Sequence, residues 1–279
     1  MSTIEQPKPE SNAEYHADIS RKSNSMLSVL KRSPQEFQGR YVTMTIPHPP
    51  STDAMGIGHV THCLSLEPME YGNRFIVMPK MDRRTNAGKA TCEEFQALAN
   101  GKEVITKDDA ETAKACVRAL LSHDQIGPLL SMEAIIEKRI NFVCNDVDMR
   151  CKLDWVKPEI KLILDVKTTS DASPWAFSKS IADYGYARQA ALYRDAVAFE
   201  YGVDCRFLFA VVCTNPPHEV ACYELTDEAM CAGMEEAVGL LDEYKARCES
   251  NNWLPAWSTG IVPIGLPSRR KHEFYGVSQ

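Results

Sequence analysis

The stretch from Leu153 to Thr169, LDWVKPEIKLILDVKTT, decides the fold and bears most directly on function. It holds two short runs of alternating apolar and polar residues on either side of a Lys157-Pro158-Glu159 turn. Such alternation is typical of β-strands, because successive side chains of a strand point to opposite faces of the sheet. We therefore expect one strand over 147–155 and another over 160–167, paired as a hairpin across the turn.

The alternation predicts an apolar and a polar face for each strand. The apolar face of the first strand consists of Val147, Met149, Cys151, Leu153 and Trp155, and its polar face of Asp148, Arg150, Lys152 and Asp154. In the second strand Ile160, Leu162, Leu164 and Val166 share one face, and Lys161, Ile163, Asp165 and Lys167 share the other. With the apolar faces matched, Asp154, Asp165 and Lys167 fall on the same polar side. Two carboxylates and an amine so placed can hold a divalent metal and activate a water against a phosphodiester.

These charges have an ordinary alternative, as solvated residues of a half-exposed antiparallel sheet. The segment that follows favours the functional interpretation. Pro174 after Ser173 is typical of a helix start, and a second helical segment spans 185–202. Within it Gln189 and Tyr193 are four residues apart and therefore share one helix face. On a helix packed beside the polar strand face, this pair would orient the lysine and the substrate backbone.

The rest of the sequence predicts an α/β fold with a mixed central sheet flanked by helices and an N-terminal helical elaboration. Further helices are expected from about Ser23 to Pro34, over 53–66, from Thr106 to about Ser122 and from Thr226 to about Cys248, and further strands over 134–143, 206–213 and 220–225. The 53–66 helix carries two histidines, His59 and His62, and two acids, Glu133 and Glu137, lie before and on the 134–143 strand. For both histidines spacing alone favours a merely structural role, and each acid has the alternative of a surface carboxylate.

Length and composition are those of a globular intracellular enzyme. The chain has 279 residues, of which 44% are hydrophobic, and this suffices for a substantial core. We expect a polar disordered tail over 1–17 and a single domain over 18–279 with its core at 130–250. No apolar run is long enough for a membrane span, and no signal peptide is visible. The 10 cysteines lack the spacing of a disulfide framework, which favours reduced thiols in the cytoplasm.

The net charge of −7 at pH 7 is unfavourable for nucleic-acid binding, because phosphate contacts supply most non-specific affinity. Positive charge is nevertheless grouped locally. Lys80, Arg83, Arg84 and Lys89, next to the Asn86-Ala87-Gly88 turn, are candidates for phosphate contacts, with a solvated surface as the alternative. An enclosed basic channel in an acidic protein would reconcile the two observations.

The order of the motifs resembles the PD-(D/E)xK nuclease superfamily, and more narrowly its RecB-like branch. The motifs are Asp154, then Asp165-Val166-Lys167, then a Gln-x-x-x-Tyr helix at 189–193. Upstream, the segment 58–62 before Leu66-Glu67-Pro68 is similar to the histidine-bearing helix of that branch, and with 82–89 it resembles the nuclease domains of the RecE (exonuclease VIII) family. The resemblance covers roughly residues 18–250, and its motifs are specific in combination and weak singly.

The chain departs from the family pattern at three points. Leu153 stands where the superfamily has its proline, and Cys151 stands where a glycine is frequent. Neither side chain would touch the metal, so both changes are tolerable. The C-terminal cysteines include no C-x-x-C pair, so we expect no iron–sulfur cluster.

The resemblance implies a metal site. Asp154, Asp165 and the backbone carbonyl of Val166 would hold Mg²⁺, which Mn²⁺ can replace, through hard oxygen ligands. His62 would lie near the ion. Glu137 would be a further acidic contributor, and Glu133 stays open as its alternative.

The resemblance also implies roles around the metal. Lys167 would orient the attacking water or take its proton, since a nearby cationic metal pushes a lysine toward its neutral form. Gln189 and Tyr193 would position Lys167 and the strand backbone.

The activity implied by the resemblance is that of an exonuclease that degrades the 5′-ended strand of linear duplex DNA. It would leave 3′ single-stranded tails for a strand-annealing recombination protein, and it would form a homotetrameric ring around the DNA. Two alternatives remain at this point: a structure-specific or single-strand endonuclease of the same superfamily, and a non-catalytic DNA-binding recombination scaffold.

Overall fold

A computed structural model describes residues 17–48, 53–78 and 101–264 of the protein, together with the single positions 15, 95 and 99. Its centre is a five-stranded sheet with the strand order β3-β4-β5-β6-β7. The strands are β3 (Ile135–Cys144), β4 (Val147–Lys157), β5 (Leu162–Thr169), β6 (Arg206–Cys213) and β7 (Val220–Glu224). Only β5 and β6 pair in parallel, and the other neighbours are antiparallel. The expected mixed central sheet is thus confirmed.

One face of the sheet is covered by the helices that connect and follow its last strands. The parallel connection from β5 to β6 runs through α9 (Pro174–Tyr184) and α10 (Tyr186–Tyr201), and α11 (Asp227–Ser250) follows β7. The hydroxyl of Ser173 caps α9 and that of Thr226 caps α11, each by accepting a backbone hydrogen bond from the first turn. Apolar residues of α10 and α11 pack with those of β3, β4 and β6 in the larger core cluster.

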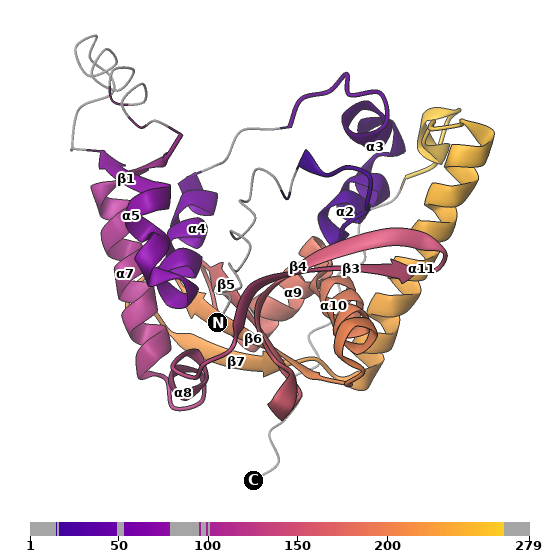
Figure 1. Cartoon of the computed structure of the whole chain (residues 1–279). Coiled ribbons are helices and arrows are strands. Elements are labelled where there is room, and N and C mark those ends of the chain that lie inside the picture. Colours follow the sequence, from indigo (N-terminus) through magenta and orange to yellow (C-terminus); the bar gives the residue numbers. More distant parts are fainter. Residues whose placement is uncertain are drawn as a thin grey trace, which may run out of the picture.

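The opposite face is covered by α7 (Lys107–Ser122) and α8 (Ile126–Leu130), which pack on residues of β4, β5 and β6 in a second cluster. Helix α4 (Asp53–Leu66) lies against α7 and continues into η1 (Pro68–Glu70) and α5 (Tyr71–Arg74). A parallel pair of short strands, β1 (Phe75–Met78) and β2 (Glu103–Thr106), completes this side. Figure 1 shows α4, α5 and α7 on one side of the sheet and α2, α3, α10 and α11 on the other.

The N-terminal helices pack against the end of the chain. Helices α2 (Asn24–Arg32) and α3 (Pro34–Tyr41) form a cluster with the segment after α11, where the rings of Phe37 and Trp253 stack at 5.6 Å. The remaining elements are the single turns η2 (Pro158–Ile160) and η3 (Ala256–Ser258). The helix α3 was not expected from the sequence, although Pro34 at its first position is a helix-start signal.

Tyr15, a described residue within the range 1–17 that was expected to form a tail, contacts a side chain of the sheet. Tyr15 is only 8% exposed, and the Arg150 guanidinium lies 4.1 Å from the centre of its ring. The segment after it continues along β4, where Lys22 exchanges backbone hydrogen bonds with Asp148 and Arg150. As a result Arg150, which was expected on a polar face, is 2% exposed. The expected polar face of β4 is thus exposed at Asp148, buried at Arg150 and half-buried at Lys152 and Asp154.

The hairpin of β4 and β5 forms, but its regular pairing is short. It is limited to Trp155–Lys157 of β4 and Leu162–Leu164 of β5, and the two strands separate at Asp154. The ladder between β3 and β4 is also interrupted there, at Glu137, whose φ of 52° lies in the left-handed region. Such a distortion breaks the alternation of side chains. Leu153 and Trp155 consequently pack in different clusters, so the prediction that they share a face was wrong.

Among the described helices, none combines the length and the apolar character that crossing a membrane requires.

Candidate active site

The candidate site lies where β4 and β5 separate, and Asp154 bridges the gap between them. Its Oδ2 accepts a hydrogen bond of 2.9 Å from the backbone N–H of Val166 on β5, which takes the place of a strand-to-strand bond. This bond turns Oδ1 toward α4, where it lies 3.0 Å from Nε2 of His62. The distortion of the sheet therefore aims one carboxylate oxygen at a helix from another part of the chain.

His62, Glu137 and Asp154 converge on one point. Nε2 of His62 lies 3.3 Å from Oε1 of Glu137, and one possible ligand atom from each of the three residues lies within 4.8 Å of the others. The left-handed backbone at Glu137 places its side chain opposite Asp154 rather than in the regular alternation of β3. We refer to these three residues as the triad.

The structure thereby separates the pairs of candidates that the sequence left open. His59 lies on the exposed side of α4, and its Nδ1 contacts a carboxylate oxygen of Glu103 at 3.0 Å. Glu133 precedes β3 with an exposed side chain, and its backbone carbonyl accepts a hydrogen bond from Lys157. Neither residue is part of the triad.

Asp165 and Lys167 lie beside the triad on β5. Asp165 is 1% exposed, and its Oδ2 lies 2.7 Å from the Nζ of Lys167. Its Oδ1 accepts a hydrogen bond of 2.9 Å from the side-chain amide of Gln189 on α10. Gln189 thus contacts the carboxylate that pairs with Lys167, and its role in positioning Lys167 stays a prediction.

An aromatic ring that the sequence analysis missed lies next to Lys167. The Nζ of Lys167 is 4.7 Å from the centre of the Tyr186 ring, a cation–π contact. Tyr186 is three residues before Gln189 on α10, so the spacing of helix neighbours was a signal that could have identified it. Tyr193, in contrast, packs into the larger core cluster, with its ring 6.2 Å from that of Phe207.

A second missed residue is Lys152, whose Nζ forms an ion pair with Oε2 of Glu137. The side chains of both partners are largely buried, at 13% and 11% exposure. Lys152 alternates with Asp154 along β4, so the period of two placed it on the same polar face. Two lysines therefore flank the carboxylates, Lys152 on the β3 side and Lys167 on the β5 side.

The charges of the site shift one another's pKa values. Burial raises the pKa of Asp165 to about 6, assisted by the neighbouring Asp154 carboxylate and opposed by Lys167. Burial acts against the charged form of His62 too, but the carboxylates of Asp154 and Glu137 overcome it and raise the His62 pKa to about 9. For Asp154 burial is likewise outweighed, by His62 and Lys167, and its pKa lies below the usual value. For Lys167 the carboxylates prevail over burial and raise the pKa. Without a metal, His62 and Lys167 are therefore cations at neutral pH.

The donor set of the triad suits a divalent metal. Glu137 and Asp154 supply hard carboxylate oxygens, and an imidazole nitrogen is a common ligand for such ions. His62 must lose its proton before Nε2 can bind a metal, because ligands bind in their deprotonated form. Oδ2 of Asp165 is fully buried and lies 2.7 Å from the Lys167 ammonium. Asp165 and the Val166 carbonyl as metal ligands stay predictions.

The four residues expected to bind DNA phosphates, Lys80, Arg83, Arg84 and Lys89, lie outside the described residues. Their role stays a prediction.

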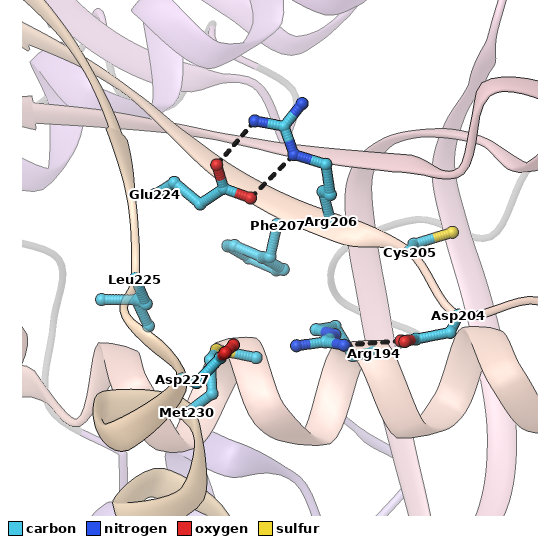
Figure 2. Close-up of a pocket in the computed structure, with 9 residues that line it drawn as sticks. All are labelled: Arg194, Asp204, Cys205, Arg206, Phe207, Glu224, Leu225, Asp227 and Met230. Atoms are coloured by element: carbon cyan, nitrogen blue, oxygen red, sulfur yellow. Dashed lines mark hydrogen bonds and ion pairs between the residues drawn. The ribbon is translucent and has the colours of Figure 1, made fainter.

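A separate pocket of about 160 Å³ lies at the other end of the sheet. Figure 2 shows two ion pairs lining it on either side of Phe207: Arg206 with Glu224, and Arg194 with Asp204. In the parallel ladder Arg206 is opposite Leu162, whereas Lys167 is opposite Val211, so this pocket lies at the far end of β5 from the triad. Its two arginines are each matched by a carboxylate, and a third acid, Asp227, also lines it.

Comparison with known proteins agrees with the fold. Residues 23–259 match the sequence profile of a family described as a PDDEXK-like domain of unknown function (DUF3799), and the chain belongs to that family. No curated protein matches the chain.

Comparison with solved structures gives two matches, which are both exonucleases by description. The first is a candidate exonuclease from Eubacterium rectale, with 11% identity, a TM-score of 0.61, and coverage of 93% of this chain and 97% of that one. The second is a phage-related exonuclease from Haemophilus somnus, with 13% identity, a TM-score of 0.32, and coverage of 62% of this chain and 90% of that one. The chain thus has the fold of the PD-(D/E)xK nucleases, a superfamily that uses divalent metals.

Proposed function

We propose that the protein is a Mg²⁺-dependent deoxyribonuclease that degrades linear duplex DNA from its ends. One observation carries the proposal: His62, Glu137 and Asp154 converge within 4.8 Å, directly beside the buried pair of Asp165 and Lys167. A scaffold that only binds DNA has no need of this cluster, because several buried carboxylates around cations are costly to maintain without a ligand.

Each residue of the site has a role in the proposed mechanism. Glu137, Asp154 and deprotonated His62, with Asp165 beside them, would hold a Mg²⁺ ion, which would supply an acidified water and positive charge beside the scissile phosphate. Lys167, held between Asp165 and the ring of Tyr186, orients the attacking water as an ammonium, or would take its proton once a bound cation has favoured the neutral amine. Gln189 keeps the Asp165 carboxylate in one orientation.

The finer features of the proposal come from the resemblance to the RecE family. They are degradation of the 5′-ended strand, 3′ tails handed to a single-strand annealing protein in homologous recombination, and a homotetrameric ring. What supports them is the order of the acid, Asp-x-Lys and Gln-x-x-x-Tyr motifs after a histidine-bearing helix. Two further features rest on the sequence itself: phosphate contacts by Lys80, Arg83, Arg84 and Lys89 on their grouped positive charge, and a cytoplasmic location on the cysteine spacing.

End-labelled linear duplex tests the reaction. With Mg²⁺ we expect early release of a 5′ label, later release of a 3′ label, no reaction in a chelator, and an intact closed circular duplex. Cleavage of the circle would identify an endonuclease, early release of the 3′ label would reverse the polarity, and binding without cleavage would indicate a scaffold. His62→Ala and His59→Ala, three residues apart on α4, form a matched pair, of which only the first should lose activity.

The homotetrameric ring is tested independently by gel filtration with light scattering. We expect a mass four times that of one chain. A monomer at the concentration used for the nuclease assay would contradict the ring and leave the proposed chemistry untouched.

A further inference from the structure

An exposed tyrosine is connected to the catalytic lysine through a second tyrosine. The ring of Tyr184 is 63% exposed at the end of α9, and its centre lies 5.6 Å from that of Tyr186 at the start of α10. The centre of the Tyr186 ring is in turn 4.7 Å from Nζ of Lys167. The exposed ring therefore lies no farther from the amine than the sum of these two distances.

The position of both rings follows from the turn between the helices. Gly185 joins α9 to α10 with a left-handed φ of 68°, and a Cβ there would lie 2.6 Å from the guanidinium of Arg188. Only glycine fits this turn without strain or collision. The turn therefore places Tyr184 and Tyr186 one on each side of Gly185.

The inner ring has rigid support. Tyr186 contacts Phe177 at 6.0 Å and Phe209 at 5.8 Å between ring centres, and both phenylalanines belong to the larger core cluster. Tyr184 thus rests on a ring whose own position is determined by the core. Tyrosine is enriched at interfaces, because its ring offers an apolar face for contact and its hydroxyl a polar end.

We propose that Tyr184 is a stacking platform for an unpaired base of the strand that is cut. The assignment rests on the proposed nuclease function. Exposed aromatic rings bind single strands by stacking, whereas the faces of bases inside a duplex are covered by their neighbours. With the scissile phosphate at the triad, Tyr184 is within reach of nucleotides only a few steps away, at ~3.4 Å per nucleotide along a strand. Tyr184 is thus a residue that selects for a frayed end over intact duplex.

Binding and base fluorescence test this proposal without requiring turnover. The probe is a single-stranded oligonucleotide that carries 2-aminopurine. Binding is measured under two conditions that prevent cleavage: with the Asp165→Asn variant in Mg²⁺, and with the protein without the Asp165 substitution in a chelator. We expect the 2-aminopurine fluorescence to be quenched on binding, and Tyr184→Ala to weaken binding about five- to a hundredfold and abolish the quenching. Tyr184→Phe keeps the ring, so its affinity and quenching should equal those of the protein with Tyr184. When Asp165 is intact and Mg²⁺ is present, Tyr184→Ala should raise the KM for cleavage and leave kcat unchanged.

Phe199 supplies a matched control. It is also 63% exposed, but it lies thirteen residues beyond Tyr186 on α10, about 20 Å farther along the helix. Phe199→Ala should leave affinity and quenching unchanged. Equal loss in both alanine variants, or unchanged affinity and quenching in Tyr184→Ala, would overturn the proposal. A changed assembly mass of Tyr184→Ala with unchanged quenching would also overturn it, because Tyr184 would then belong to an interface between copies of the chain. A parent that binds through Tyr184 but does not cleave would refute the nuclease function alone.

Discussion

The two ends of the central sheet hold charged side chains in opposite ways. Near the middle of β5, Asp165 and Lys167 are buried and shared among several neighbours, with Gln189 on one oxygen and Tyr186 against the amine. At the start of β6, Arg206 and Glu224 are 67% and 42% exposed and are matched in a simple pair. Exposed pairs are screened by water and contribute little, whereas buried charges shift one another's pKa values. The burial of the charges, rather than their number, thus distinguishes the candidate site from the pocket in Figure 2.

The largest expected effect is a difference in cleavage rate between alanine variants of two aspartates, one at each end of the sheet. Asp165→Ala should abolish Mg²⁺-dependent cleavage, because it removes the buried carboxylate beside the triad. Asp204→Ala, which breaks the exposed pair with Arg194, should leave cleavage unchanged. Initial rates on linear duplex measure both, and full activity of Asp165→Ala would refute the site.

The next largest effect is a difference in rate between variants of two cationic residues, one at each end of the sheet. Lys167→Met should lower kcat by about 10²–10⁴ if Lys167 transfers the proton of the attacking water. Arg206→Met should be indistinguishable from the parent in single-turnover rates. A loss of less than tenfold in Lys167→Met would exclude the general-base role.

A smaller effect compares two residues of α10. Gln189→Ala frees the Asp165 carboxylate to rotate and should reduce metal affinity or rate by about 10- to 100-fold, as loss of an orienting partner does. Arg194→Ala, near the middle of the same helix, serves as the control, and calorimetric titration with Mg²⁺ gives the affinities. Equal affinities and rates in the two variants would indicate that the Gln189 bond has no functional role.

Metal affinity should also depend on pH. The His62 pKa of about 9 lies above its usual value, so the imidazole is protonated at neutral pH and must release a proton to bind a metal. Affinity should therefore rise by up to about tenfold per pH unit until the pH reaches about 9. In the metal-free protein the cationic form stabilises the fold, so this contribution is full below the ordinary histidine pKa and is lost as pH rises through about 9. His62→Gln should flatten the pH dependence of metal affinity, and an unchanged slope would exclude His62 as a ligand.

The smallest effect is expected at the pocket. Arg206→Ala should change the free energy of unfolding by only about 0.2–1 kcal/mol, the range of exposed ion pairs. Denaturant unfolding measures it. A loss of several kcal/mol would show that this end of the sheet is held as tightly as the site.

Much of the fold was predictable because local signals agreed with one another. The Ser173-Pro174 start of α9, the Thr106 start of α7 and the Thr226 start of α11 were expected where the structure has them. The strand β6 was expected over its observed range. Capping hydroxyls, proline and runs of apolar residues act within a few positions of the chain, so they are visible in sequence.

The site was predictable only in part. Alternation placed Asp154, Asp165 and Lys167 on one polar side, but it also placed Trp155 with Leu153, which the distortion at Asp154 contradicts. A left-handed residue such as Glu137 inside a strand leaves no clear signal in sequence, because its strain is balanced by contacts from distant segments.

The sequence by itself determined the elements and the motif order that mark a PD-(D/E)xK chain, because caps, breakers and the period of two are local properties. Only the tertiary structure decided which acid and which histidine meet, Glu137 and His62 rather than Glu133 and His59. It also decided that Gln189 holds Asp165 and that Lys152 and Tyr186 join the site. The physical reason is that these contacts join α4, β3, β4, β5 and α10, and their geometry depends on how the helices pack on a sheet that is distorted where they meet.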